Sequence, residues 1–221
     1  MDAQEILTQI ASVASEVALC ERCALHFSRK KSVPGEGPAN AEIMFIGEGP
    51  GFYENEQGRP FVGPSGKFLD ELLGKAGLKR QEVFIGNVVK CRPPANRDPL
   101  PEELTECRPY LDRQIAAINP HIIITLGRYS MAYFMPNAKI SAVHGKSVWN
   151  NGRLVVAMYH PAAALHQPAL HDAIVSDFEN LPKYIALARQ SATPKSSPPA
   201  AEPSAAKEED ADDKPVQLSL F

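Results

Sequence analysis

The sequence lacks the features that would place the protein in a membrane or outside the cell. No apolar run approaches the ~18 residues of a membrane-spanning helix. The opening segment MDAQEILTQI does not have the basic and then apolar layout of a signal peptide. Cysteine is scarce, with four in 221 residues. We therefore expect a cytoplasmic protein, in which a reducing environment makes the four thiols ligands rather than disulfides.

A surplus of positive charge, which is usual in DNA-binding domains, is also missing. The formal net charge is −3, from 23 basic and 26 acidic side chains. The excess of acid lies in residues 191–221, which contain three lysines and six acidic side chains, so residues 1–190 are neutral overall. A domain without net charge can bind DNA through a local basic surface, but the net charge of residues 1–190 gives no evidence of DNA binding.

The pattern of apolar residues predicts an α/β fold. Hydrophobic residues make up 44% of the chain, enough for the core of one large domain. Ser65 and Gly77 are the expected cap and stop of one helix, and Asn151-Gly152 is a hairpin turn signal. The expected helices cover 4–18, 65–76, 101–118, 127–134 and 170–189, and the expected strands cover 43–47, 83–89, 122–126, 148–150 and 153–158. This alternation favours a parallel sheet covered by helices on both faces.

The four cysteines have a spacing that suits a metal centre. Cys20 and Cys23 form a C-x-x-C pair, and Cys91 and Cys107 lie sixteen positions apart on either side of a proline-rich loop. Four thiolates bind either zinc or an iron–sulfur cluster, and spacing alone does not decide between them. The alternative is that they are buried core cysteines without a ligand.

Three segments of the expected sheet carry candidate site residues. Residues 47–51, GEGPG, follow the first strand, and glycines there allow backbone amides to approach a ligand, although a plain tight turn has the same signature. Asn87 lies within an apolar strand, where a buried amide must find partners. His160 follows the last strand. Because parallel strands end at one edge of a sheet, Glu48, Asn87 and His160 should converge there.

Several ordered motifs together resemble the family 4 uracil-DNA glycosylases, over about residues 10–190. The residues that carry the resemblance are GEGPG at 47–51, Glu54, GRPFVG at 58–63, NVVKCRPPANRDPLP at 87–101, HPAA at 160–163 and the four cysteines. The resemblance implies a three-layer α/β/α sandwich with a central four-stranded parallel sheet. It also implies a [4Fe-4S] cluster on Cys20, Cys23, Cys91 and Cys107.

The same resemblance implies an enzyme that hydrolyses the N-glycosidic bond of uracil in DNA, leaving an abasic site for base excision repair. Phe61 would stack on a flipped uracil, Asn87 would read its edge, and His160 would stabilise the charge that develops on O2. The implied uracil-binding set is Glu48, Gly49, Pro50, Phe61, Asn87 and His160, and the implied catalytic set is His160, Glu48 and Glu54. Gly49 stands where the best-known uracil glycosylases keep a catalytic Asp, so no residue is assigned to activate water.

Other residues have weaker signals for DNA contact. Leu165 follows the HPAA segment and is a candidate wedge for the gap left by a flipped base, with a core leucine as the alternative. Residues 29–31, Arg-Lys-Lys, are candidate phosphate contacts, with a solvated surface as the alternative. The expected partner is uracil-containing single- or double-stranded DNA.

Two rival functions share part of this signature. A related subfamily forms a covalent adduct with uracil-DNA through a histidine in a basic insert, and residues 91–94, CRPP, contain neither. A non-catalytic iron–sulfur module for DNA binding or redox sensing would need the cysteines but neither Asn87 nor His160.

The C-terminal segment predicts a tether with a docking peptide. Residues 191–215 are rich in Pro, Ala, Ser and charge without periodicity, which is typical of a disordered linker. The final residues Gln217, Leu218, Leu220 and Phe221, within QLSLF, resemble the peptide by which bacterial DNA enzymes bind the replication sliding clamp. We thus expect a glycosylase domain at 1–190, a linker at 191–215 and a clamp-binding peptide at 216–221. The protein is expected to be a monomer at the bacterial nucleoid.

Overall fold

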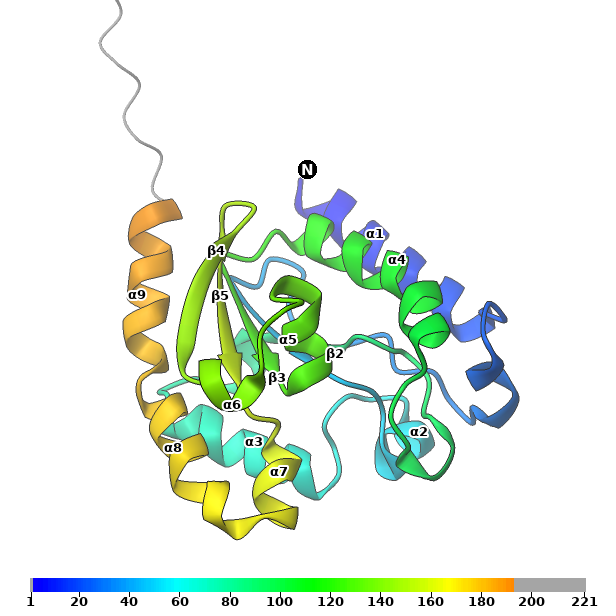
Figure 1. Ribbon diagram of the computed structural model, residues 1–221. Coiled ribbons are helices and arrows are strands. Elements are labelled where there is room, and N and C mark those ends of the chain that lie inside the picture. Colours follow the sequence, from blue (N-terminus) through cyan, green and yellow to red (C-terminus); the bar gives the residue numbers. More distant parts are fainter. Residues whose placement is uncertain (1, 193–221) are drawn as a thin grey trace, which may run out of the picture.

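The computed structural model describes residues 2–192, and residue 1 and residues 193–221 lie outside the described part (Figure 1). Within it, five strands form one sheet in the order β2-β1-β3-β5-β4. The strands are β1 (Ile43–Gly47), β2 (Phe84–Asn87), β3 (Ile122–Leu126), β4 (Lys146–Asn150) and β5 (Arg153–Met158). Strands β1, β2, β3 and β5 are parallel, and β4 pairs antiparallel with β5. The expected α/β fold with four parallel strands is confirmed, and the antiparallel β4 adds a fifth strand at the edge.

Helices cover both faces of the sheet, which is why β1 and β3 are buried at every position. On one face, Phe45 and Val156 join a core with Leu72 of α3, Phe178 of α8 and Ile185 of α9. On the other face, side chains of β1, β3 and β5 pack against α4. The helices are α1 (Ala3–Leu19), α2 (Phe52–Gln57), α3 (Pro64–Lys75), α4 (Pro101–Ile118), α5 (Arg128–Phe134), α6 (Ile140–Val143), α7 (Pro161–His166), α8 (His171–Glu179) and α9 (Leu181–Ala192). Short 3-10 turns cover Ala24–Ser28, Arg80–Glu82, Pro94–Asn96 and Pro168–Leu170.

The hairpin between β4 and β5 forms as its turn residues predict. Asn151 and Gly152 both have positive φ, at 47° and 77°. A two-residue turn of this handedness matches the twist of the strands that it joins. The hairpin directs β5 so that its carboxyl end lies beside that of β3, with Leu126 in register with Met158.

Several expected boundaries are wrong for local reasons. The expected helix at 170–189 is divided into α8 and α9 at Asn180, because Pro182 lacks an N–H and fits only the first turn of a helix. Helix α9 continues to Ala192, two residues beyond the expected end of the domain. Gly63 rather than Ser65 caps α3, with Pro64 at the first helical position.

None of the helices in residues 2–192 is both long enough and apolar enough to cross a membrane. The carboxyl ends of the four parallel strands point to one edge of the sheet, and the loops after β1, β2 and β5 meet there. Ligands bind at this edge in open α/β folds.

Candidate functional site

A pocket of about 380 Å³ opens at the carboxyl edge of the sheet. The turn after β1, the end of β2 and the start of α7 all contribute to its wall. Every residue expected in the base pocket lines it: Glu48, Gly49, Pro50, Glu54, Phe61, Asn87 and His160. The convergence that the strand pattern predicted is therefore present in the structure.

Asn87 presents an unused acceptor to this pocket. It is the last residue of β2 and only 1% exposed, yet its Oδ1 has no hydrogen-bond partner. Buried polar atoms in proteins are nearly always hydrogen-bonded, so an orphaned acceptor at a pocket wall suits a ligand donor. Gly47 makes room for it, because a Cβ there would lie 2.5 Å from Asn87 Oδ1 and 2.7 Å from Phe61 Cζ.

His160 is held as a neutral imidazole with a known tautomer. The Ala162 backbone N–H donates to His160 Nδ1 at 3.1 Å, so Nδ1 carries no proton and the ring hydrogen is on Nε2. Burial lowers the pKa of His160 to about 4, although the negative charge of Glu54 opposes the shift. Its ring is stacked on Phe61 with centroids 5.4 Å apart. At neutral pH this side chain therefore offers Nε2–H as a donor.

Phe61 is held in a strained backbone conformation at the pocket wall. Its φ is +51°, which is unusual for a bulky residue, and it is 5% exposed. Helix α3 approaches it so closely that a Cβ on Gly66 would lie 2.0 Å from the Phe61 carbonyl oxygen. Such strain persists only where the surroundings enforce it, and it is typical of functional sites.

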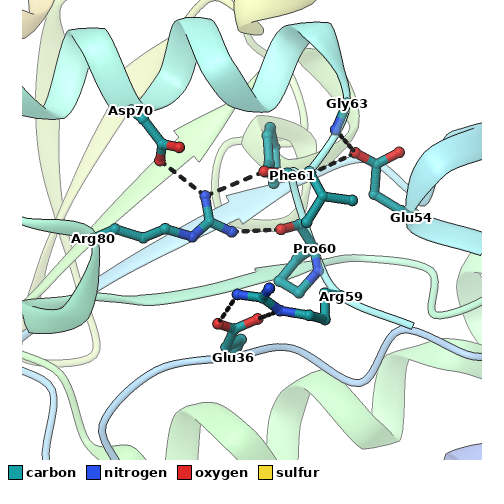
Figure 2. A network of polar contacts seen from close by, with 9 residues as sticks. Glu36, Glu54, Arg59, Pro60, Phe61, Gly63, Asp70 and Arg80 are labelled. Atoms are coloured by element: carbon teal, nitrogen blue, oxygen red, sulfur yellow. Dashed lines mark hydrogen bonds and ion pairs between the residues drawn. The ribbon is translucent and has the colours of Figure 1, made fainter. Parts of the chain in front are cut away.

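Two charged side chains hold the Phe61 loop from opposite sides (Figure 2). The Glu54 carboxylate accepts backbone N–H groups from Gly51 at 3.1 Å and from Val62 and Gly63 at 2.9 Å each. The Arg80 guanidinium donates to the carbonyl oxygens of Phe61 at 3.2 Å and Pro60 at 2.5 Å. Arg80 also pairs with Asp70 at 3.0 Å. The geometry favours a positioning role for Glu54 over the expected catalytic one.

Glu48 is the other carboxylate of the pocket. Burial raises its pKa above the ordinary range, repulsion from Asp98 adds to the rise, and the positive charge of Arg128 opposes it. The turn that carries it is closed by the Val89 N–H, which donates to the Glu48 carbonyl at 3.0 Å. Gly49 is needed there, because a Cβ would come within 2.7 Å of Val89 Cγ2.

Sequence reasoning missed the residues that shape the pocket rim from the loop after Cys91. Asn96 and Arg97 line the pocket, and Arg97 is anchored by two hydrogen bonds to Glu103, at 2.7 and 2.9 Å. The Glu103 carboxylate is 2% exposed, and the ion pair keeps its pKa below the ordinary range. A lone Arg in a loop and a lone Glu in a helix show no pattern in sequence. Arg80 was missed for the same reason.

The four cysteines gather in one small core beside the pocket loop. Cys91 and Cys107 are buried, Cys20 and Cys23 are partly buried, and all four lie in one hydrophobic cluster with residues of α1 and α4. Burial raises the pKa of the Cys107 thiol to about 12. Within residues 2–192 no group of three or more Cys, His, Asp or Glu has the arrangement of a site for one metal ion.

In the basic run at 29–31, Lys30 and Lys31 are exposed, whereas Arg29 is not available to meet a phosphate in the same way. The Arg29 guanidinium points inward, donating to the Cys20 carbonyl at 2.8 Å and to Cys91 Sγ at 3.5 Å. Lys30 pairs with Glu56. Leu165, in contrast, is 52% exposed on α7 beside the pocket, so it is not the core leucine of the alternative reading.

Comparison with known proteins supports these observations. A model of the Uracil DNA glycosylase superfamily matches residues 34–181. The chain is 49% identical over 179 residues to a type-4 uracil-DNA glycosylase of Saccharolobus solfataricus, covering 76% of this chain and 83% of the relative. It is 44% identical over 185 residues to that of Archaeoglobus fulgidus, covering 79% and 92%. It is 41% identical over 178 residues to that of Thermotoga maritima, covering 78% and 93%.

Proposed function

The chain belongs to the uracil-DNA glycosylase superfamily, and we propose that the pocket at the carboxyl edge of the sheet is where it removes uracil from DNA. It acts in DNA repair as a hydrolase of the N-glycosidic bond. The observation that carries the assignment is the pairing of an orphaned Asn87 Oδ1 with a neutral His160 in one pocket walled by Phe61.

The pocket has the size and lining for one flipped base. A base inside a duplex is out of reach, so the nucleotide must be extruded, at a cost of about a few kcal/mol that is lower for a mispaired uracil. The Phe61 ring supplies an apolar face for stacking.

Asn87 supplies the recognition of uracil. Its Oδ1 accepts the uracil N3–H and its Nδ2 donates to O4, whereas cytosine presents the opposite pattern. Because Asn87 is buried and Oδ1 has no protein partner, cytosine would leave both polar groups unpaired. Sites of this kind reject the wrong substrate strongly.

His160 stabilises the leaving base. When the C1′–N1 bond breaks, the electron pair moves into the uracil ring and charge develops at O2. The Nε2–H of His160 donates to that oxygen, helped by backbone amides of the turn at 48–49. Since the imidazole stays neutral well above its lowered pKa of about 4, it acts by hydrogen bonding rather than by transferring a proton.

Water then adds to C1′ of the sugar. Glu54 is engaged by three backbone N–H groups, which makes Glu48 our candidate for the carboxylate that orients the water. Leu165, exposed beside the pocket, is our candidate for the wedge that fills the gap in the stack.

The cysteine core fits the [4Fe-4S] cluster that the family resemblance implies. Cys20, Cys23, Cys91 and Cys107 would hold it, and the cluster would supply a cross-link between the end of α1 and the loop that carries Arg97. Around it, the Lys90 N–H donates to Cys107 Sγ at 3.2 Å and Arg29 to Cys91 Sγ, which suits thiolate sulfur.

An excision assay tests the assignment. Anaerobically purified protein is incubated with oligonucleotides containing U·G, U·A or single-stranded uracil, and abasic sites are cleaved with alkali. Uracil-dependent scission that is lost in His160→Ala supports the proposal. Intact strands from protein that retains its iron would favour the non-catalytic module, and a stable mass increase with uracil-DNA would favour the crosslinking relative.

The expected linker at 191–215 and the peptide QLSLF lie almost entirely outside the described residues. We propose that Gln217, Leu218, Leu220 and Phe221 bind the bacterial replication sliding clamp at the nucleoid. The enzyme would act as a monomer that the linker tethers to the clamp. A linker of this length spans roughly 25–30 Å. Deleting residues 217–221 should abolish clamp binding and leave excision on free oligonucleotides unchanged, and unaltered clamp affinity would refute the idea.

A further inference from the structure

An exposed pair of aromatic rings borders the mouth of the pocket. Phe52 and Tyr53 begin α2, directly after Gly51 of the pocket wall, and they are 52% and 50% exposed. Their rings meet edge to face, with centroids 5.4 Å apart at 86°. The sheet core does not include either residue. Their placement beside the pocket therefore has no explanation in the stability of the core.

Arg92, from the loop after β2, lies over the first of these rings. Its guanidinium carbon is 5.3 Å from the Phe52 centroid, and its Nε donates to Asn96 Oδ1 at 2.8 Å. Pro93, which follows Arg92 in the chain, and Asn96, which accepts this hydrogen bond, both line the pocket. The cation therefore comes from the loop after β2, and the ring comes from the start of α2.

The charge of Arg92 is left uncompensated, unlike that of its neighbours. Around the pocket Arg59, Arg97 and Arg128 each form an ion pair with a carboxylate. Among residues 2–192 no carboxylate lies within ion-pair distance of Arg92. An unpaired cation stacked on an exposed ring complements a nucleotide, which has an aromatic base and an anionic phosphate.

We propose that Phe52 and Arg92 form a platform that binds the nucleotide next to uracil in the same DNA strand. The inference rests on the proposed function, since a uracil in the pocket brings its neighbour in the strand to this rim. Flipping removes a stacking partner from that neighbouring base, and the Phe52 ring replaces it while Arg92 meets the phosphate. Stacking of this kind tolerates any base, because each base has a π-face. The platform adds affinity for the strand without adding sequence preference.

Phe52 is a better site for the test than Tyr53. A Cβ on Gly63 would lie 3.0 Å from Tyr53 Cδ2, so Tyr53 packs against the loop that Glu54 holds. Trp149 offers a matched control for Phe52. It is 49% exposed, and it lies on β4 opposite Leu154 at the start of β5, at the far end of the strand from the pocket.

The experiment combines protein and DNA changes in one cycle. Single-turnover excision at subsaturating enzyme is measured for wild type, Phe52→Ala, Phe52→Trp and Trp149→Ala. The single-stranded oligonucleotides carry intact neighbours or a tetrahydrofuran residue, which has no base, on the 5′ or the 3′ side of uracil. On the intact strand the excision rate of Phe52→Ala should be about tenfold below that of wild type, which is the usual effect of removing an aromatic side chain that stacks on a base. Phe52→Trp and Trp149→Ala should stay near wild type.

The decisive comparison is between strands that have and strands that lack the base on one side of uracil. The wild-type excision rate should fall about tenfold when that base is absent. The rate of Phe52→Ala should be the same with and without the base, because this variant has already lost the stacking contact. The platform is overturned if the ratio of the Phe52→Ala rate to the wild-type rate is the same on all three strands. It is also overturned if Phe52→Ala keeps the full wild-type rate on the intact strand.

A binding measurement separates failure of the platform from failure of the proposed function. In a His160→Ala background, 2-aminopurine beside a uracil reports stacking by its fluorescence. If protein binding quenches the 2-aminopurine fluorescence and the Phe52→Ala substitution removes this quenching, the platform is supported even if no uracil is excised. If the fluorescence of the bound DNA is the same with and without the Phe52→Ala substitution, the platform is overturned. Arg92→Gln should reduce the slope of log affinity against log salt by about 0.7, the value for one phosphate of a single strand. An unchanged slope, in protein that retains its iron, would remove Arg92 from the platform.

Discussion

Replacing Arg80 should slow excision although Arg80 does not line the pocket. In Arg80→Met the carbonyl oxygens of Phe61 and Pro60 lose their charged donor, while the apolar stem of the side chain is kept. Phe61 must keep its φ of +51°, a conformation that costs about 1–3 kcal/mol and is held by these contacts and by Glu54. Without Arg80 the ring should leave the pocket wall for part of the time.

The magnitude follows from the two lost hydrogen bonds. Bonds to charged groups contribute about 1.5–3 kcal/mol each. The Arg80 side chain is 20% exposed, so water replaces part of the interaction, and a total of about 2 kcal/mol is reasonable. If this whole free energy serves to keep the Phe61 loop in its active conformation, the single-turnover rate falls by up to about 30-fold when it is lost. The melting temperature should fall by no more than about 4–8 °C.

Arg59→Met is the matched control for this experiment. Arg59 belongs to the same loop, but its guanidinium pairs with Glu36 at the surface and holds none of the loop carbonyls (Figure 2). Its loss should leave the excision rate within about twofold, as is usual for an exposed ion pair. The reasoning is refuted if Arg80→Met excises uracil at the wild-type rate, or if both variants slow it equally.

Further predictions concern the pocket and the cysteine core. His160→Ala should lower the single-turnover rate about 10²–10³-fold, the usual cost of one oxyanion donor, and a twofold change would contradict its role. Because burial lowers the pKa of His160 to about 4, the ring stays neutral as the pH falls past 6.5, so the rate should show no decline with a midpoint near 6.5; such a midpoint would contradict a neutral imidazole. Gly47→Ala should abolish excision while the protein stays folded, since its Cβ would displace Asn87 Oδ1 and the Phe61 ring, and circular dichroism checks the fold. Cys107→Ser should lower the iron content and the melting temperature together, and an unchanged iron content would contradict its assignment as a ligand.

Sequence patterns predicted the framework because the forces involved act locally. Alternating strands and helices, the Asn151-Gly152 turn and the helix from Pro101 depend on periodicity and on residues adjacent in the chain. The convergence of Asn87 and His160 was also predictable, because parallel strands end at one edge. The division of the last helix at Asn180 had a local signal in Pro182, which the expected single helix overlooked.

The amino-acid sequence by itself determined the fold class, the convergence of Glu48, Asn87 and His160 at one edge of the sheet, and the four cysteines that gather beside the pocket. Only the tertiary structure decided what holds them. Glu54 and Arg80 bind the Phe61 loop from 8 to 20 positions away, and Arg29 meets Cys91 across 62 positions. Such contacts depend on how loops pack once the sheet has formed, and no periodicity or spacing encodes them. The same holds for Arg92 and Phe52, which become neighbours because β1 and β2 end side by side.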